Sequence, residues 1–163
     1  MGIEVPHAPG PGLPEELVTS TIFLLKRLGW AARDRSLDAY ERECGLHPYH
    51  HAVLALLDEG SVETQGAIAD ALGYDRGQLV GLLDELEEKK LVERRRDPAD
   101  RRRHIVQLTP RGKQELTKLR ALARRLEDEF LASLDDDQRA ELHTALRLLA
   151  RRHLPQYANG ARP

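Results

Sequence analysis

Apolar residues recur with a helical period through most of the chain, and the clearest stripe lies between residues 75 and 90. Asp75, before the stripe, is a good hydrogen-bond acceptor for a helix N-terminus, and Gln78 three residues later completes the pattern of a capping box. The pattern predicts a helix that begins at Asp75 or Arg76 and buries one side. The buried stripe repeats at i, i+3, i+4 and i+7 and consists of Leu79, Leu82, Leu83 and Leu86. The opposite face carries Arg76, Gly77, Val80, Gly81 and Asp84.

A second short helix is predicted directly before this one. It runs through Leu72, and Gly73 is expected to end it in a left-handed conformation before a three-residue turn to Asp75. Two short helices joined in this way form a helix-turn-helix, whose second helix enters the major groove of DNA. Gly77 and Gly81 each cost about 1 kcal/mol relative to alanine inside a helix, which favours a helix that another backbone approaches closely.

After Lys90 the apolar period changes from 3.6 to 2. Residues 91–94 and 104–108 are predicted to be two strands, and Asp-Pro-Ala-Asp at residues 97–100 is predicted to be the turn between them. Between Lys89 and Arg103, eight basic residues stand against three acidic ones, a net charge of +5, whereas the whole chain carries −2. A positive hairpin on an acidic body suits contact with phosphates and the release of counterions from DNA.

Three motifs in this region carry a resemblance to a known family. They are L-V-x-R at residues 91–94, D-P-x-D-R-R at residues 97–102 and L-T-x-x-G at residues 108–112. With the helices before them, they resemble the DNA-binding lobe of the MarR family of bacterial regulators (multiple antibiotic resistance regulator type), and the resemblance covers roughly residues 17–154. It implies a homodimer that binds pseudo-palindromic operators and releases them when a ligand or an oxidant acts.

Longer helices are predicted on both sides of this lobe. On the N-terminal side, residues 14–43 are expected to form one helix that Gly45 ends, and Pro48 is placed at the first position of the next helix. On the C-terminal side, Thr109 is expected to cap a helix with a heptad seam, and a last helix should follow. The stripe of that last helix is Leu142, Leu146 and Leu149.

The predicted fold class is mainly α with a small two- or three-stranded β-wing, that is, a winged helix-turn-helix with long N- and C-terminal dimerisation helices. The resemblance gives the dimerisation role. The predicted parts are a flexible arm at 1–13, whose alternative is a disordered end, a helical dimerisation region at 14–46 and 110–155, a winged helix-turn-helix lobe at 47–109, and a loose tail at 156–163.

Composition supports a helical protein with an interior of leucine and alanine. The chain has 163 residues, of which 32% are charged and 4% are aromatic, so we expect one domain or at most two. A single cysteine, Cys44, excludes an intrachain disulfide, and without a secretion signal it predicts a cytoplasmic protein. No apolar run has the length of a membrane span, so no membrane partner is expected.

The residues expected to contact DNA follow from the helix-turn-helix and the hairpin. Arg76 and Gln78 are candidates for base contacts, because arginine matches guanine and glutamine matches adenine, although Gln78 has a competing role in the capping box. The resemblance places Arg102 in the minor groove, with Asp100 orienting it. The expected phosphate contacts are Thr64 and Gln65 before the first helix, together with a subset of the wing arginines Arg94, Arg95, Arg96, Arg101 and Arg103.

A ligand site between the first two helices and the helix after the wing is expected from the resemblance and from nearby aromatic and polar residues, which include Tyr40. A phenolic or other aromatic anion would suit it, with Arg33 as a counter-charge. Trp30 has the alternative of filling the core or an interface. The expected site residues are Trp30, Arg33, Tyr49, His50 and His51.

Two other kinds of sensing stay open at the level of sequence. His47 and His51, four residues apart, could chelate a metal with Glu43 or Cys44, but we expect no metal because residues 116–130 supply no further histidine. Cys44 could sense an oxidant, although the neighbouring carboxylate of Glu43 should raise its thiol pKa and make it inert. A regulator without any ligand is the remaining alternative of the same fold.

Two other classes of protein are weighed against a DNA-binding regulator. An enzyme is disfavoured because the sequence has no Gly-rich phosphate loop, nucleophile elbow or H-E-x-x-H motif, and no cofactor is expected. A protein-interaction module would explain the heptads but leaves the charged hairpin and the paired glycines without a purpose. The expected partners are therefore double-stranded DNA, a second copy of the chain and a small-molecule effector.

Overall fold

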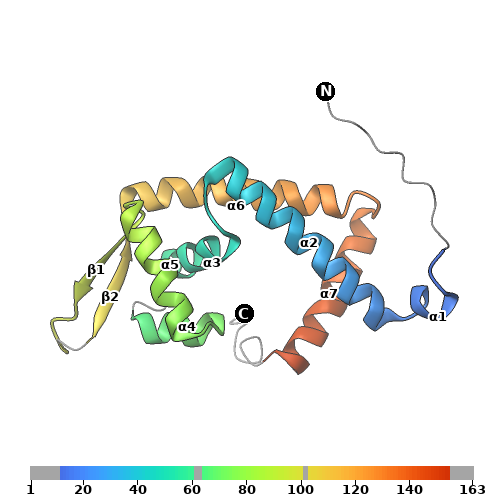
Figure 1. The fold of residues 1–163 in the computed structure, drawn as a ribbon, viewed down its shortest axis with the longest axis horizontal. Coiled ribbons are helices and arrows are strands. Elements are labelled where there is room, and N and C mark those ends of the chain that lie inside the picture. Colours follow the sequence, from blue (N-terminus) through green and yellow to red (C-terminus); the bar gives the residue numbers. More distant parts are fainter. Residues whose placement is uncertain (1–11, 61–63, 101–102, 155–163) are drawn as a thin grey trace. The chain divides into compact units, whose positions relative to one another are not determined.

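The computed structural model describes residues 12–60, 64–100 and 103–154 (Figure 1). They form a mainly helical protein with one small antiparallel sheet, which confirms the predicted fold class. The chain divides into two compact units, Met1–Arg35 and Ser36–Pro163. The elements are α1 Glu15–Val18, α2 Thr21–Cys44, α3 Pro48–Asp58, α4 Gln65–Leu72, α5 Arg76–Glu88, β1 Val92–Arg96, β2 His104–Leu108, α6 Pro110–Phe130 and α7 Asp136–His153. None of the helices in these ranges is both long enough and apolar enough to span a bilayer.

The first unit contains α1 and most of α2, and here the prediction of one unbroken helix was wrong. The chain leaves the helix at Thr19 and Ser20. The Thr19 hydroxyl donates to the Glu15 carbonyl (2.8 Å), and the Ser20 hydroxyl accepts from the Phe23 amide (3.3 Å). Serine and threonine side chains offer such local partners to the backbone, which is why they interrupt a helix that apolar periodicity alone would extend.

The core of the second unit is built around α3. Its Val53 and Leu54 are completely buried, as are Ile68 of α4, Leu83 of α5 and Leu119 of α6. Burying a side chain of this size contributes about 1.5–3 kcal/mol, so these contacts dominate the stability of the unit. Because α3 packs against α4, α5, α6 and β2, it holds the helix-turn-helix and the wing to one centre.

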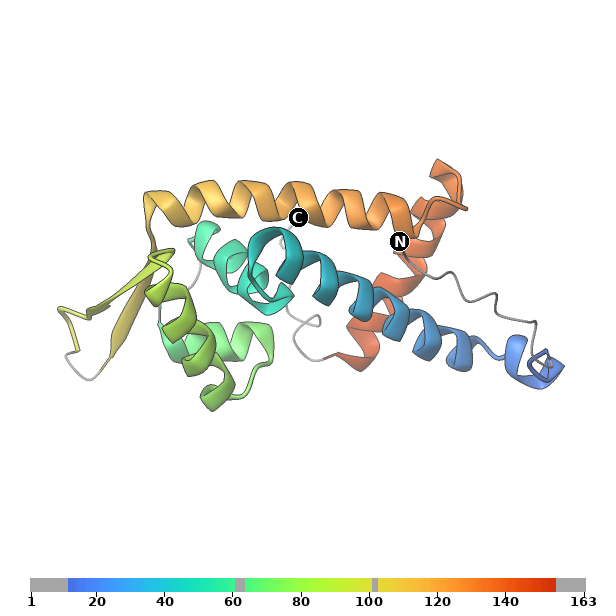
Figure 2. The ribbon, with the colours of Figure 1, turned by 45° about the horizontal axis from the view of Figure 1, so that its top comes forward.

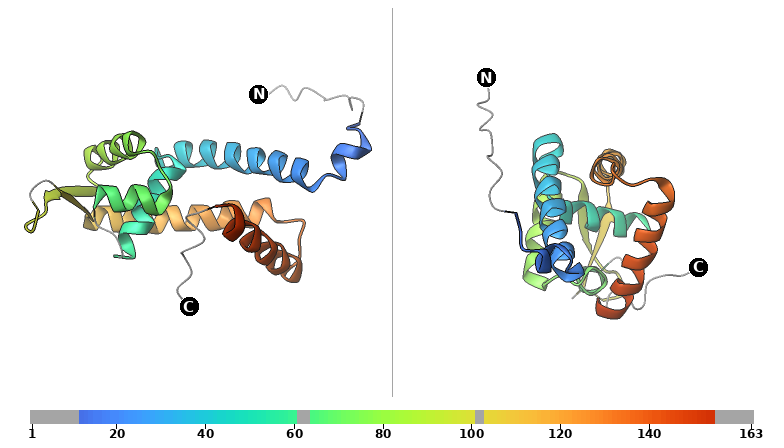
Figure 3. Two further views of the ribbon diagram at one scale, coloured as in Figure 1. Left: turned by 90° about the horizontal axis from the view of Figure 1, so that it is seen from below. Right: turned by 90° about the vertical axis from the view of Figure 1, so that its right-hand side faces the viewer.

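Helix α6 runs from the base of the wing along α3, and α7 leaves its far end at an angle (Figures 2 and 3). Leu116 and Leu119 of the predicted seam are buried in the core. The last helix begins as predicted with a capping box, in which Asp135 accepts from the Gln138 amide (2.9 Å) and Gln138 accepts from the Asp135 amide (3.1 Å). None of the side chains of α7 is buried within this chain.

The wing is a two-stranded hairpin in which Val92 pairs with Leu108 and Arg96 pairs with His104. Among the described residues, one isolated antiparallel β-bridge joins Thr64 to Ile105, at the place of a third strand. Val92 is buried at the base, whereas Arg96 is exposed toward the tip. At the predicted turn, the Ala99 amide donates to the Asp97 carboxylate (2.8 Å), and the Asp97 amide donates to the Arg103 carbonyl (3.0 Å).

The base of the wing is fixed to the start of α6 by the L-T-x-x-G motif. The Thr109 hydroxyl donates to the Lys90 carbonyl (2.7 Å) and accepts from the Gly112 amide (2.9 Å), so it caps α6 and ties the helix to the strand. Lys90 itself has a φ of +59°, an uncommon value outside glycine that turns the chain sharply into β1. The motif therefore sets the direction in which the wing leaves the body.

Candidate nucleic-acid interface

The helix-turn-helix has the predicted turn. Thr64 caps α4 by accepting from the Ala67 amide (3.3 Å), and Gly73 ends it with a φ of +68°. Asp75 then caps α5, with one carboxylate oxygen accepting from the amides of Gly77 (2.8 Å) and Gln78 (3.2 Å). In the second half of the predicted capping box, the Gln78 side chain would accept from the Asp75 amide, and the described residues show no such bond. The Gln78 side chain is exposed and does not have that competing role.

The outer face of α5 is exposed from Arg76 to Gly81, while its leucine stripe is buried as predicted. The side chains of Arg76, Gln78 and Val80 are exposed on α5 away from the leucine stripe. A Cβ atom on Gly81 would meet no described atom within 4 Å. The backbone that the sequence analysis expects to approach Gly81 is therefore not in the described part of this chain.

Beside this face, the wing presents Arg95, Arg96 and Arg103 to solvent. Arg95 pairs with Glu93 (2.7 Å), and the Arg103 guanidinium lies 3.6 Å from the Asp100 carboxylate. Exposed ion pairs of this kind are weak, so these arginines can exchange their carboxylates for phosphates at little cost. The predicted contacts Arg101 and Arg102 lie outside the described residues, as does the predicted pairing of Arg102 with Asp100.

Arg94 departs from the prediction that groups it with the outward arginines. Its guanidinium is bound by Glu87 and Asp84 of α5, and only 22% of its side chain is exposed. Hydrogen bonds from Arg94 lower the pKa of the Glu87 carboxyl, so the pair stays charged at neutral pH. The Arg94 side chain therefore binds to α5 and does not point into solvent. The acidic pair Asp84 and Glu87 at i, i+3 is visible in the sequence, but the sequence does not show that it meets Arg94.

The predicted ligand residues of α3 face different neighbours, and their role in a ligand site stays a prediction. Consecutive helical residues diverge by about 100°, which separates these three side chains. Tyr49 packs on Tyr74 (ring centroids 5.1 Å apart), His50 turns inward, and His51 shares a 2.7 Å hydrogen bond with Tyr40. Tyr40, one of the aromatic residues from which the ligand site is expected, is buried and is the hydrogen-bond partner of His51.

His50 is a structural residue. Its Nδ1 accepts from the His47 amide (3.0 Å), which completes a capping box at the start of α3, and its side chain is almost fully buried. The Nε2 atom lies 3.2 Å from a Glu85 carboxylate oxygen, within ion-pair distance but without a hydrogen bond among the described atoms. Burial lowers the pKa of His50 more than Glu85 raises it, so the ring is neutral at pH 7.

Trp30 and Arg33, the other predicted ligand residues, belong to the first unit. The Trp30 side chain is 58% exposed, with the Lys26 ammonium 5.8 Å from the centre of its ring. Arg33 lies 3.8 Å from the Asp34 carboxylate. Their proposed role in a ligand site stays a prediction.

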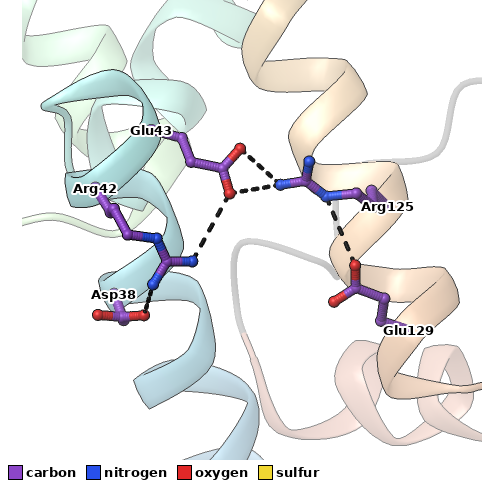
Figure 4. A network of polar contacts seen from close by, with 5 residues as sticks. All are labelled: Asp38, Arg42, Glu43, Arg125 and Glu129. Carbon is purple, nitrogen blue, oxygen red and sulfur yellow. Dashed lines mark hydrogen bonds and ion pairs between the residues drawn. The ribbon is translucent and has the colours of Figure 1, made fainter. Parts of the chain in front are cut away.

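The geometry gives little support to metal sensing or to oxidant sensing. Burial raises the pKa of the Cys44 thiol, and Glu115 and Glu43 raise it further, as the sequence predicted for an inert cysteine. The Glu43 carboxylate is held by Arg125 at 2.6 and 2.7 Å (Figure 4), and His47 Nδ1 accepts from the Tyr49 amide. Within the described ranges, no three His, Cys, Asp or Glu side chains gather as a metal site would require.

Comparison with known proteins agrees with this geometry. A sequence model of the MarR family matches residues 45–103. The transcriptional regulatory protein assigned to the hcr operon of Thauera aromatica is 33% identical over 115 residues, which make up 71% of this chain and 69% of that protein.

Solved structures extend the likeness to the whole fold. The transcriptional repressor CouR bound to a 23-mer DNA duplex is 35% identical, with a TM-score of 0.77 over 86% of this chain and 100% of the CouR chain. CouR from Rhodococcus jostii RHA1 bound to p-coumaroyl-CoA has a TM-score of 0.70 at 26% identity, over 84% and 96% of the two chains. With its helix-turn-helix, its basic wing and these relatives, the chain belongs to the MarR family of transcriptional regulators.

Proposed function

We propose that this chain is a homodimeric repressor that binds an inverted-repeat operator in double-stranded DNA and is modulated by a small aromatic effector. The observation that carries the proposal is the open face of α5 lying beside the exposed arginines of β1 in one compact unit. A helix of this width fits the major groove, and arginines at its flank can neutralise the adjacent phosphates. The repressor CouR, which has the same fold, was solved on a DNA duplex.

The roles within this interface divide by chemistry. Arg76 and Gln78 read base edges, and Arg95, Arg96 and Arg103 contact phosphates. The Thr64 hydroxyl accepts from the Ala67 amide in the cap of α4 and still has its own hydrogen to donate, so Thr64, Gln65 and the free amides of the helix N-terminus contact a phosphate there. By resemblance, Arg102 enters the minor groove.

A homodimer is supported by apolar surface that a lone chain leaves in water. In the first unit, Ile22 is 76% exposed and Leu28 is 52% exposed. In the second unit, α7 exposes Leu146, Leu148 and Leu149. Exposed apolar residues in such numbers mark an interaction surface. Twofold symmetry would place two copies of α5 about 34 Å apart, one turn of B-DNA, which predicts an inverted repeat.

Selection from a random duplex library tests the DNA-binding function. The expected result is an inverted repeat bound by a dimer, seen by mobility shift and by sedimentation of the complex. Gln78→Ala should relax one base position by about 1–3 kcal/mol, and Arg102→Ala should weaken binding to the selected duplex. The proposal fails if the protein binds no duplex at low salt.

The effector is proposed on the likeness to CouR, which was solved with p-coumaroyl-CoA. In this chain, the Tyr40–His51 pair offers a polar group beside an aromatic ring, because the rings stack with centroids 5.8 Å apart. Such a pair suits a phenol or an aromatic carboxylate. Calorimetry with p-coumaroyl-CoA and with free p-coumarate tests this, and Tyr40→Phe should weaken any binding. Absence of heat with both compounds would leave a regulator without this class of ligand.

A further inference from the structure

Arg94 of β1 is joined to the recognition helix α5 by four hydrogen bonds. Its backbone amide donates to Glu87 Oε1 (3.2 Å), and its guanidinium donates to Glu87 Oε2 through Nε (2.9 Å) and Nη2 (2.6 Å). The same Nη2 donates to Asp84 Oδ1 (2.5 Å). One arginine thus closes on two carboxylates that stand three residues apart on the helix.

This arrangement differs from the surface ion pairs of the wing. The Arg94 side chain is 22% exposed, whereas Arg95 beside it is 67% exposed and pairs with Glu93 of its own strand. Paired, charge-assisted hydrogen bonds from a planar guanidinium fix both distance and orientation, which an exposed single contact does not. The contact between β1 and α5 is therefore directional as well as apolar.

We propose that Arg94 is a positioning residue for DNA binding, which locks the wing to the recognition helix so that both meet the duplex as one rigid reader. The inference rests on the proposed DNA-binding function and deepens it. The L-T-x-x-G motif attaches the base of the wing to α6 beside the buried Leu91. Arg94, the third residue of β1, adds a second attachment, from the wing to α5, and the two together set the angle at which Arg95 and Arg96 reach the phosphates.

The clamp also controls charge at the edge of the reading face. Asp84 is 57% exposed and Glu87 is 39% exposed, and both stand on the helix that approaches the DNA. Unpaired carboxylates there would repel phosphates, and the charge of Arg94 offsets one of the two negative charges. The effect of removing the Glu87 charge on DNA affinity therefore distinguishes a role in charge from a role as a clamp. If charge alone mattered, removing the Glu87 charge would strengthen DNA binding, whereas loss of the clamp would weaken it.

Four variants separate a clamp from a phosphate contact on a selected duplex: Arg94→Lys, Glu87→Gln, the double variant, and Arg95→Met as the matched control. We expect Arg94→Lys to bind about tenfold more weakly although it keeps its charge, because the lysine ammonium lacks the planar set of donors with which Arg94 holds Glu87 and Asp84 in a fixed orientation. Glu87→Gln should weaken binding by about fivefold, and the double variant should match Arg94→Lys because the two residues act as one unit. The salt dependence should stay that of wild type in all three, while Arg95→Met should lower the salt slope by about 0.9.

Amide hydrogen exchange on DNA-free protein checks the mechanism directly. The Arg94 amide should exchange about tenfold faster in Glu87→Gln because its acceptor is weakened, while the amides of α3 keep wild-type protection and show that the fold is intact. If Arg94→Lys binds like wild type, or Glu87→Gln binds equally well or more tightly, Arg94 is not a clamp. If wild-type protein binds no duplex, the proposed function fails instead, and the positioning role falls with it.

Discussion

A Cβ atom placed on Gly112 would lie 2.0 Å from the carbonyl oxygen of Leu91, at the point where α6 crosses the start of the wing. The same carbonyl accepts from the Thr109 amide (3.1 Å), so the backbone there cannot retreat without losing a bond. The glycine of L-T-x-x-G is therefore required by packing and not by backbone conformation. We expect Gly112→Ala to lower the free energy of unfolding by about 2–3 kcal/mol, as overpacking of a rigid contact does. Urea unfolding measures it, and a loss below 0.5 kcal/mol would contradict the contact.

Gly81 provides the opposite case on the recognition helix. A Cβ atom there meets no described atom within 4 Å, so Gly81→Ala should raise the free energy of unfolding by about 0.5–1 kcal/mol through better helix propensity. The same methyl group would stand on the face proposed to enter the major groove, so operator binding should weaken by about 1–3 kcal/mol, the size of one lost base contact. Unfolding measurements give the gain in stability, and a mobility-shift assay on the same preparation gives the loss of operator affinity. Unchanged DNA affinity would place Gly81 away from the duplex.

The helices of the reader could be predicted from sequence because their signals are local. The leucine stripe, the Asp75 cap and Gly73 each depend on residues within one or two turns, and all three are confirmed. The break at Ser20 was missed because hydroxyl side chains satisfy backbone groups in a helix and at its start alike, so the residue type alone does not decide.

The contacts between elements were harder to predict. The bonds from Arg94 to Glu87, and the carbonyl of Leu91 over Gly112, depend on how a strand crosses a helix, which periodicity does not encode. The histidines of α3 show the same limit. Sequence offered His47 with His51 as a metal pair and His50 with His51 as ligand residues, whereas in the fold His50 caps its own helix and His51 bonds Tyr40.

His50 gives the stability of the protein a pH dependence whose sign is fixed. Burial lowers its pKa in the folded chain, although Glu85 and Glu41 favour the charged ring against His47 and Lys89. The unfolded chain takes up this proton near the ordinary value of about 6.5. Below that pH the unfolded state binds more protons, so the free energy of unfolding falls as the pH falls, and the loss is complete below the lowered pKa.

Chemical unfolding between pH 8 and pH 5 tests this with the variant His50→Gln. Glutamine at the third helical position can still accept from the His47 amide, so the cap is retained. The variant should lose less stability on acidification than wild type. Some loss should remain, because burial also lowers the pKa of His51. Carboxylates such as Glu87, whose pKa is lowered by Arg94, act only at more acid pH. An unchanged slope would show that His50 does not titrate differently on folding.

The exposed leucines of α7 predict how dimer formation and DNA binding are linked. Leu149 is 45% exposed within one chain and shares a face with Leu142 and Leu146, so a charge there should cost a lone chain little. In a homodimer that buries this face, Leu149→Glu should shift the protein toward monomer in sedimentation and weaken operator binding at least tenfold, about 1.4 kcal/mol. Thr144→Glu adds the same charge on the opposite side of the helix and should keep the wild-type assembly. If both variants sediment and bind like wild type, this face of α7 is not the dimer interface.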